Sequence, residues 1–230
     1  MASSARALAI YLDAPLQSWG CGSKFQQRGT ESHPTKSGVI GMFCAAAGAA
    51  RGSENEQKII SALRGAKFSV WEVATKINGG ESTRIEDFHT IGGGYNREDS
   101  TDKLRISQKA EGGVGETVVT RRYYLSQAKF IAVITGGAEM LDKISSTLEN
   151  PRWGVWFGRK SCIPASPLLP TLASGTQEAL KTILDRLGVQ VEVRGVQDDE
   201  TFGAEGGWRQ RDEPVSYLER IFYTRKVCKA

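Results

Sequence analysis

A segment poor in large apolar residues, residues 78–120, divides this sequence into two parts. Its sequence, NGGESTRIEDFHTIGGGYNREDSTDKLRISQKAEGGVGETVVT, contains two glycine pairs and a glycine triplet. A packed core forms by removing apolar surface from water, so this segment cannot contribute much to one. Connections of this length are uncommon and are usually functional or disordered. We therefore expect a protruding hairpin or a long loop inserted into the folded unit.

The residues on either side of this segment alternate between strand and helix patterns. Strand patterns, rich in β-branched and aromatic residues, cover residues 5–15, 66–77 and 121–136, the last being one long strand or a hairpin. Helical spacing of apolar residues covers residues 33–50, 53–65 and 138–150. The resulting order of strands and helices is that of ferredoxin-like folds, which RNA-recognition modules share. Further along the chain, an amphipathic helix at 174–188 precedes strands at 189–196 and 215–229.

The composition is mildly basic, with 30 Lys and Arg against 26 Asp and Glu, a net charge of +4 and a pI near 8.9. This charge is compatible with a polyanionic partner, although many basic proteins bind no nucleic acid. Four cysteines lie far apart and only two histidines are present, so we expect reduced thiols, no metal and no cofactor. The apolar run ALAIYL is too short for a signal peptide or a membrane span, which predicts a cytoplasmic protein without membrane contact.

Several common enzyme motifs are missing from the chain. It contains no GxxxxGK[ST] or GxGxxG loop for phosphates, no GxSxG nucleophile elbow and no HExxH zinc motif. The stretch GGGYN at residues 92–96 is rich in turn residues but has no phosphate-loop context. The chain therefore offers none of these motifs as a starting point for a catalytic site.

Three short stretches place cations beside aromatic, hydroxyl or glycine residues. Arg121 and Arg122 precede two tyrosines, so each face of a strand would carry one cation and one ring for stacking and phosphate contact. The stretch Gly-Arg-Lys-Ser at 158–161 follows two tryptophans and suits phosphate oxygens. Lys36 and Ser37 open a helix whose free N–H groups favour an anion. The alternatives are a solvated strand end, exposed charges and ordinary N-capping.

Trp19 follows the first strand directly, among small and polar neighbours. Trp19 has three interpretations. It is a core residue beneath a loop, a ring that stacks on a base, or a brace that positions Gln17 and Ser18 so that they contact the base instead. His89 is the histidine available for acid–base chemistry in an exposed loop, and His33 lies just before a helix opening. Lone loop histidines are usually polar surface, so a catalytic role is the minor alternative.

Six stretches of the chain, taken in order and at their spacing, resemble the CasD subunits of type I-E CRISPR Cascade complexes, which belong to the RAMP superfamily of RNA-binding proteins. They are APLQSWG, PTKSGVIGMFCAAAG, DFHTI, RRYYL, NPRWGVWFGRKSCIPASPL and RDEP. The resemblance runs from about residue 5 to the C-terminal strand and covers nearly the whole chain. Its most specific part is LQSWG followed by PTKSG and then by GRKSC.

The resemblance implies an α+β fold with an RRM-like, ferredoxin-like domain, an inserted β-hairpin thumb and a small C-terminal β region. The implied boundaries are 1–77 with 121–170 for the RRM-like domain, 78–120 for the thumb and 171–230 for a C-terminal α/β region packed on it. In this subtype a separate endoribonuclease cuts the precursor RNA, so the resemblance implies a structural RNA binder that is not an enzyme and has no catalytic residues. Such a subunit would bind the 5′ handle of the mature crRNA and cap the backbone of the complex. Its partners would be the neighbouring backbone subunits and the large subunit, and it would meet target DNA only through the complex.

The RNA contacts that follow from the resemblance fall on the motif regions and the thumb. They are Gln17, Ser18, Trp19, Lys36, Ser37, His89, Arg97, Lys103, Arg105, Arg121, Arg122, Arg159, Lys160 and Ser161. One related subtype has a catalytic form that processes precursor CRISPR RNA. Its catalytic motif is similar to a Tyr together with a Lys-His pair. This chain has no Lys-His dipeptide, which argues against the alternative function of a metal-independent endoribonuclease.

Overall fold

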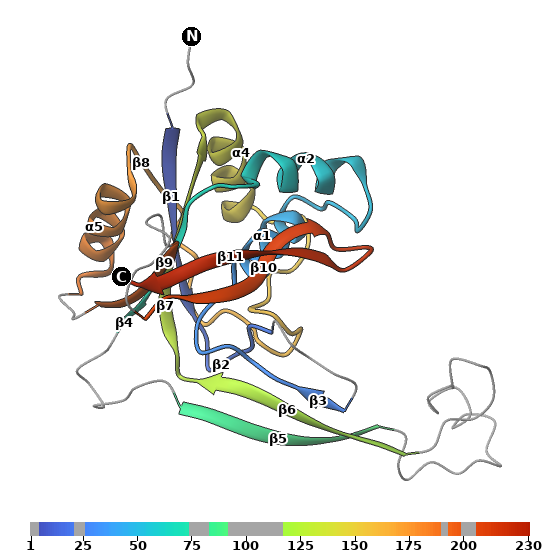
Figure 1. The fold of residues 1–230 in the computed structure, drawn as a ribbon. Helices are drawn as coiled ribbons and strands as arrows, with labels where there is room; N and C mark the ends of the chain where they lie inside the picture. Colours follow the sequence, from blue (N-terminus) through green and yellow to red (C-terminus); the bar gives the residue numbers. More distant parts are fainter. Residues whose placement is uncertain (1–4, 21–25, 74–82, 92–116, 190–192, 199–205) are drawn as a thin grey trace.

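The computed structural model describes residues 5–20, 26–73, 83–91, 117–189, 193–198 and 206–230, and these residues form two antiparallel-rich sheets with helices packed against the larger one (Figure 1). The larger sheet has seven strands in the order β10-β11-β9-β4-β7-β1-β8. In chain order they are β1 (Ala5–Asp13), β4 (Phe68–Val73), β7 (Lys129–Gly137), β8 (Thr171–Ala173), β9 (Val193–Asp198), β10 (Trp208–Ser216) and β11 (Ile221–Lys229).

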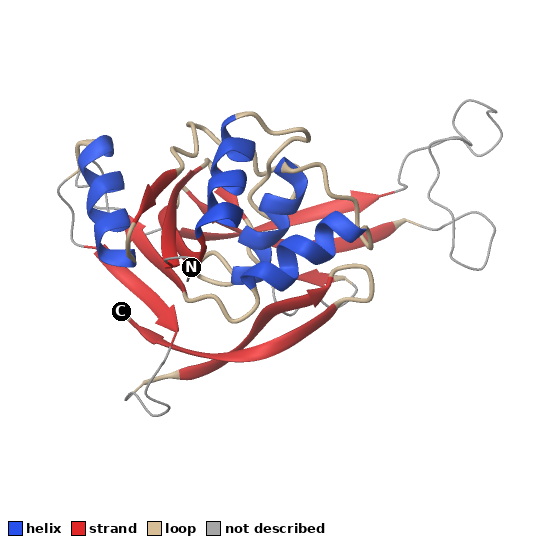
Figure 2. Ribbon diagram, turned by 90° about the horizontal axis from the view of Figure 1, so that it is seen from above, coloured by secondary structure: helices blue, strands red, loops and turns tan. Residues whose placement is uncertain are grey.

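Helices cover both faces of the large sheet (Figure 2). On one face lie α1 (Lys36–Ala46), α2 (Glu54–Leu63) and α4 (Ala138–Glu149), and on the other lies α5 (Thr176–Leu187). Strand β1 supplies both cores, because alternate side chains of a strand point to opposite faces. Leu8, Ile10 and Leu12 pack with the three helices, and Ala7, Ala9 and Tyr11 pack towards α5. A strand buried on both faces explains the nearly continuous apolar run at its start.

The predicted helices are confirmed, and their ends follow from local residues. Thr35 caps α1 by accepting a hydrogen bond from the Gly38 N–H at 3.2 Å. Ser53 caps α2 through the Glu56 N–H at 3.2 Å. Helix α5 ends at Gly188, whose φ of 65° is left-handed and therefore suits glycine. None of the described helices combines the length and apolar character needed to cross a membrane.

The C-terminal part differs from the sequence prediction in two ways. The single strand expected over 215–229 is a hairpin of β10 and β11, with a turn at Tyr217–Arg220 in which Arg220 has a φ of 57°. The turn residues are Tyr, Leu, Glu and Arg, without glycine or proline, so the sequence pattern does not reveal the turn. Strand β9 pairs with β4, so the C-terminal strands extend the main sheet instead of forming a separate small one.

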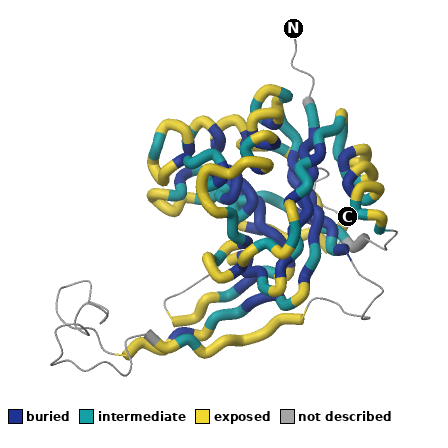
Figure 3. Tube along the Cα trace, turned by 180° about the vertical axis from the view of Figure 1, so that it is seen from behind, coloured by how far each residue is buried: buried dark blue, intermediate teal, exposed yellow. Residues whose placement is uncertain are grey.

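The smaller sheet carries an antiparallel pair of long strands that leaves the body of the molecule (Figures 1 and 3). Its members are β2 (Leu16–Gln17), β3 (Gln27–Arg28), β5 (Thr83–Ile91) and β6 (Val118–Ser126). Strand β5 pairs with β6 along its whole length, and its described side chains are largely exposed. We call the β5–β6 pair the arm. Residues 92–116, between its strands, lie outside the described part of the chain.

Candidate nucleic-acid interface

The loop that leaves β1 is fixed from inside by Gln17. Its Nε2 group donates to the carbonyl oxygens of Leu12 at 3.1 Å and Ala128 at 2.7 Å, and its Oε1 accepts from the Trp19 indole at 2.9 Å. Gln17 is fully buried and Trp19 is 1% exposed. The indole ring stacks on Phe157, with 5.9 Å between ring centroids. Of the interpretations left open by the sequence, the structure supports a core residue beneath the loop, because Trp19 belongs to the main core cluster, and its indole N–H also holds Gln17 in place.

The same loop is held tightly against the basic turn at 158–161. The Ser18 N–H donates to the Phe157 carbonyl at 3.0 Å, and the Ser18 hydroxyl donates to the Tyr123 carbonyl at 3.3 Å. Gly158 has a φ of 93°, and a Cβ atom there would lie 1.7 Å from the Ser18 carbonyl oxygen. Only glycine fits this approach, because any other residue would be strained and would also overlap the facing backbone.

Within the basic turn, the two cations have different environments. The Arg159 guanidinium donates to the carbonyl oxygens of Tyr123 at 3.1 Å and Arg28 at 2.7 Å, and it lies 4.6 Å from the centre of the Tyr124 ring. Arg159 therefore ties the turn to β6 and β3. Lys160 is exposed, with its Nζ atom 5.9 Å from the Trp156 ring centre, and Ser161 is also exposed. Lys160 and Ser161 are thus the members of the turn that face solvent.

The opening of α1 already holds an anion, which is a carboxylate of the protein itself. The Lys36 N–H donates to Asp212 at 2.8 Å, and the Lys36 Nζ donates to Glu213 at 2.6 Å and to the Ala66 carbonyl at 2.6 Å. Arg225 pairs with Asp212 in turn, at 2.7 Å. Lys36 is 1% exposed. An external phosphate cannot use this lysine or this N–H group in the described structure. Ser37, which is half-buried, stays at the surface beside them.

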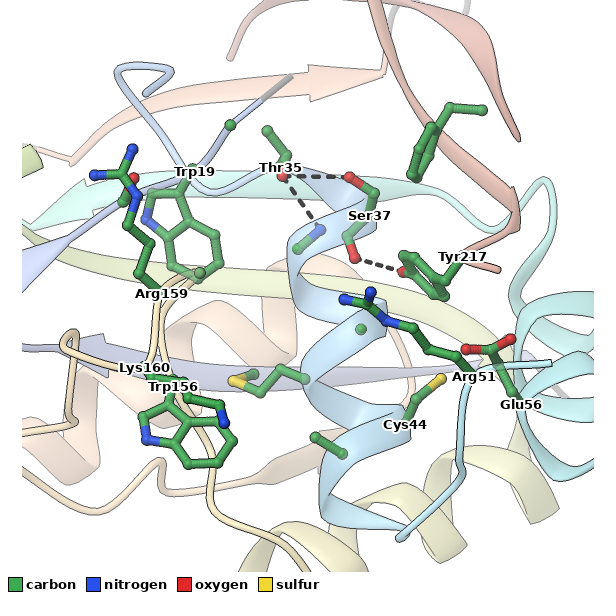
Figure 4. A pocket seen from close by; sticks show the side chains of 18 of the residues that line it. Trp19, Thr35, Ser37, Cys44, Arg51, Glu56, Trp156, Arg159, Lys160 and Tyr217 are labelled. Atoms are coloured by element: carbon green, nitrogen blue, oxygen red, sulfur yellow. Dashed lines mark hydrogen bonds between the residues drawn. The ribbon is translucent and has the colours of Figure 1, made fainter. Parts of the chain in front are cut away.

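A trough of about 540 Å³ lies along the outer side of α1, and we call it the α1 trough (Figure 4). The α1 residues that line it include Gly38, Gly41 and Ala45, with Ala49 just beyond the helix end. One side is lined by Trp19, Trp156, Arg159 and Lys160, and the other by Arg51, Glu56 and Tyr217. The lining also includes Ser18, Trp153 and Phe222. Small residues on the helix let a flat group approach the backbone closely, while rings and cations supply stacking and charge.

Two glycines of α1 line the trough, and the close fit depends on the first of them, Gly38. A Cβ atom at Gly38 would lie 2.8 Å from the Trp19 ring, so this glycine makes room for the indole. A Cβ atom at Gly41 would lie 3.5 Å from the Tyr217 hydroxyl, which is ordinary contact. Tyr217 donates that hydroxyl to the Ser37 carbonyl. Burial, followed by the nearby acidic groups, raises its pKa well above the usual value, so it stays protonated at neutral pH.

Cys44 lines the trough as well, on the side of Arg51 and Glu56 (Figure 4). Burial, with the Glu56 carboxylate nearby, raises the pKa of its thiol to about 12. A thiol with this pKa is almost wholly protonated at pH 7, so it is not an activated nucleophile. The trough therefore has the groups for binding, whereas its cysteine and its tyrosine are not poised for proton transfer or nucleophilic attack.

The arm carries a second group of cations and rings. Phe88, which is 62% exposed, lies opposite Arg121, whose guanidinium is 5.2 Å from the ring centre. Arg84 lies 4.7 Å from the centre of the Tyr123 ring on the same face. Arg121 also meets Glu86 at 3.6 Å. This face offers alternating cationic and aromatic groups, as the Arg-Arg-Tyr-Tyr pattern predicts.

The opposite face of the arm holds Arg122 and His89. Arg122 donates to the Thr120 hydroxyl at 3.1 Å, and the Thr120 hydroxyl donates to the His89 carbonyl at 3.3 Å. His89 lies on strand β5 and is half-buried, so its placement in an exposed loop was wrong. The predicted contacts Arg97, Lys103 and Arg105 lie outside the described residues.

Several residues of the trough and arm were not among the predicted contacts. Trp153 and Trp156 lie in the motif NPRWGVWFGRKSCIPASPL. Their position shortly before Arg159 and Lys160 was the sequence feature that could have predicted a contact with RNA. Arg84 and Phe88 lie in or beside the DFHTI motif. Tyr217 gave no local signal, because it reaches the trough from the far end of the chain.

The fold and the trough define an α+β protein with a basic, aromatic groove of the kind that accommodates nucleic acid. The sequence profile of the family described as CRISPR-associated protein (Cas_Cas5) matches residues 7–228, and the chain belongs to this family. It is 28% identical, over 95% of its length and 93% of the relative, to the CRISPR system Cascade subunit CasD of Escherichia coli (strain K12).

Solved structures give the same result. A chain of a CRISPR RNA-guided surveillance complex matches with a TM-score of 0.72 and 29% identity, covering 97% of this chain and 89% of that one. The crystal structure of a Cas protein matches with a TM-score of 0.65 and 25% identity, covering 97% and 93%. The resemblance drawn from the sequence motifs is thereby confirmed.

Proposed function

We propose that this chain is a non-catalytic Cascade subunit that binds the 5′ handle of a mature crRNA. In this role it caps the backbone of the complex, contacts the neighbouring backbone subunits and the large subunit, and meets target DNA through the complex. The support is membership of the Cas_Cas5 family together with the likeness to a Cascade subunit and to a chain of an RNA-guided complex.

The observation that carries the proposal is the α1 trough. Three regions distant in sequence, namely the loop after β1, the outer face of α1 and the 153–161 stretch, meet there. The trough combines exposed cations, Lys160 and Arg51, with the rings of Trp153 and Trp156. Single-stranded nucleic acids bind such surfaces by base stacking and by phosphate neutralisation. A handle nucleotide in the trough would lie with its base against the tryptophans and its phosphate near Lys160.

The predicted contacts divide by their environment. Gln17, Trp19, Lys36 and Arg159 act through the protein, because their polar groups hold the walls of the trough in place. The residues proposed to meet RNA directly are the accessible ones, with Trp156 added: Ser37, Lys160, Ser161, Arg121, Arg122 and His89. Ser18 is buried at the trough wall and contributes through its backbone. Arg97, Lys103 and Arg105 stay predictions.

The finer fold assignment belongs to the same proposal. Strands β4, β7, β1 and β8 lie side by side in that order, and helices follow β1 and β7 along the chain. A βαββαβ unit folded in this way is ferredoxin-like, as in RRM domains. We assign the arm as the base of the inserted thumb, which would carry the RNA away from the body towards a backbone neighbour.

A metal-independent ribonuclease is the less supported function. The tyrosine of the trough has a raised pKa, and so does its cysteine. His33 is buried against Gln210, at 3.1 Å, and does not line the trough. A general base needs a pKa near the working pH and access to the substrate, and these three groups lack one or both.

The test is binding of a fluorescent handle RNA to the purified chain, measured by anisotropy over a range of salt concentrations. Lys160→Ala should weaken binding and lower the slope of log affinity against log salt by about 0.7, the value for one phosphate contact on a single strand. Trp156→Ala should cost about 1–3 kcal/mol as the loss of one stacked base, with Trp156→Phe retaining most of it. Lys181→Ala, a charge-matched control on α5, should change neither quantity. If Lys160→Ala and Lys181→Ala had the same affinity for handle RNA and the same salt slope, the trough would not be the site where the handle binds.

A further inference from the structure

A second cleft, of about 770 Å³, lies at the end of the β10–β11 hairpin opposite the turn that borders the α1 trough. We call it the hairpin cleft. Its lining consists of Lys36, Gly65, Ala66, Lys67, Asp198, Arg209, Arg211, Glu213, Thr224, Arg225 and Lys226. Six of these residues are cations and two are acids, so the cleft has an excess of four positive charges.

Both acids of the cleft are already neutralised from within. Glu213 pairs with Lys36 at 2.6 Å, and Asp198 pairs with Arg225 at 2.5 Å and accepts from the Phe68 N–H at 2.7 Å. Lys36 and Arg225 are buried or nearly so, with side chains 1% and 9% exposed. Arg225 also pairs with Asp212, at 2.7 Å. Of the other cations of the lining, Arg209 and Arg211 are exposed arginines on β10.

The arginines of β10 are directed outward. Arg209 and Arg211 are exposed, while Gln210 and Asp212 between and after them are buried, which is the alternation of a strand. Arg209 has no hydrogen bond or ion pair with the described residues. Arg211 uses its Nε for the Phe222 carbonyl at 3.1 Å, which leaves its terminal nitrogens free of any bond recorded among the described residues. Lys226 is paired with Arg209 across the hairpin register.

We infer that the hairpin cleft binds the phosphate backbone of a nucleic acid, at a site separate from the α1 trough. Arginine forks donate two parallel hydrogen bonds to phosphate oxygens, and the Thr224 hydroxyl is a further donor. A protein partner fits less well, because the centre of a protein–protein interface is apolar with aromatic anchors. Among the described residues that line this cleft, none has an apolar side chain larger than that of Ala66. Interfaces with nucleic acids are instead polar and strongly positive.

The two sites border different parts of one hairpin. Tyr217 and Phe222, at the turn, border the α1 trough, whereas Arg209 and Lys226, near the other end, border the hairpin cleft. Phe222 of the trough and Thr224 of the cleft lie two residues apart on β11, so the two sites are neighbours along this strand. Competition with handle RNA therefore has to show whether the cleft binds independently of the trough.

The experiment measures binding of a fluorescent 30-base-pair DNA duplex of random sequence, and of single-stranded DNA and RNA of the same length, to the full chain at several salt concentrations. Arg209→Ala with Arg211→Ala should weaken binding about tenfold or more at low salt and lower the duplex salt slope by about 2, or about 1.4 for single strands. Whichever probe loses the most affinity identifies the nucleic acid. Lys143→Ala with Lys181→Ala removes the same charge from α4 and α5 and should leave the slope at the wild-type value.

Additional variants and competitors test the specificity of the hairpin cleft. Arg209→Lys with Arg211→Lys should keep most of the slope, and one equivalent of unlabelled handle RNA, enough to fill the α1 trough, should not displace the bound duplex. If the double alanine variant loses its thermal unfolding transition, Arg209→Ala alone should still lower the duplex slope by about 0.9. Equal effects of the double alanine variants at the arginines and at the control lysines would overturn the inference. Displacement of the duplex by one equivalent of handle RNA, or preferential binding of a poly-glutamate peptide, would overturn it too.

Discussion

Gly158 and the carbonyl oxygen of Ser18 approach so closely that a Cβ atom at position 158 would lie only 1.7 Å from that oxygen. This contact joins the loop after the first strand to the basic turn, and both line the α1 trough. The shape of the trough therefore depends on a residue without a side chain. The contribution of Gly158 to the stability of the protein can be measured without any ligand.

Gly158→Ala should destabilise the protein more than Gly65→Ala, a substitution that also strains the backbone but places the new methyl group where it meets no neighbouring atom. Gly65 has a φ of 71° with nothing within 4 Å of a built Cβ atom, so Gly65→Ala should cost about 1 kcal/mol from backbone strain alone. Gly158→Ala adds a backbone overlap and should cost roughly 3 kcal/mol or more. Urea unfolding of both variants measures the difference. Equal losses would mean that the loop and the turn separate at little cost.

Arg159→Ala and Lys160→Ala should separate structure from binding in adjacent residues. Arg159 donates to two backbone carbonyls and lies on the Tyr124 ring, so its loss should lower stability by about 1–3 kcal/mol. Lys160 is exposed, and its loss should leave the free energy of unfolding within about 0.5 kcal/mol of wild type. Thermal or urea unfolding gives the answer. A larger stability loss for Lys160→Ala would show that the assigned roles are reversed.

Lys36→Met should be strongly destabilising, because it leaves Glu213 without its cation in a buried setting. Removing one partner of a buried ion pair costs about 3–5 kcal/mol. Lys36→Met with Glu213→Gln removes both charges and should recover much of that loss, since the glutamine oxygen can still accept from the Gly65 N–H. A double-mutant cycle by urea unfolding measures the coupling, and simple addition of the two single losses would show that the pair is not coupled.

The buried histidine should make stability depend on pH. Burial lowers the pKa of His33 below 6.5, partly opposed by the hydrogen bond to Gln210 and by Glu31 and Asp212, while Arg225 adds to the lowering. Below pH 6.5 the unfolded chain takes up this proton more readily than the folded protein, so the free energy of unfolding should fall as pH drops. In His33→Gln this component disappears, and the decline below about pH 6.5 should be shallower. An unchanged decline would place its cause elsewhere.

The purified chain should not cleave labelled repeat RNA in the presence of EDTA. This follows from the protonated state of the tyrosine and cysteine that line the trough. Product analysis on a denaturing gel provides the measurement. A single specific product, lost in His89→Ala, would restore the ribonuclease alternative.

Much of the fold follows from periodic patterns in the sequence. The helices starting at Lys36, Glu54, Ala138 and Thr176 all coincide with apolar residues at helical spacing, and three of them also have recognisable capping or stop residues. The β10–β11 hairpin was missed because Tyr217–Arg220 lacks turn residues and Arg220 itself takes the left-handed conformation. The partnership of β9 with β4 depends on residues far apart in the chain, which periodicity does not encode.

The candidate site was predicted by region more accurately than by residue. The motifs that contain Trp19, Ser37 and Lys160 do meet at one trough. Sequence alone could not show that Lys36 is buried, because its partners Asp212 and Glu213 are about 176 residues away. A lysine and a serine at a helix opening look the same whether the anion is a phosphate or a distant carboxylate.

The most direct test of handle binding in the α1 trough is a structure of the chain bound to handle RNA, alone or in its complex. We predict a nucleotide in the trough, with its base stacked on Trp156 or Trp153 and a phosphate oxygen within hydrogen-bond distance of the Lys160 Nζ atom. We also predict that Trp19 stays on Phe157, without a base on its ring. Handle RNA bound elsewhere, with the trough empty or filled by a neighbouring protein, would contradict the proposed role of the trough.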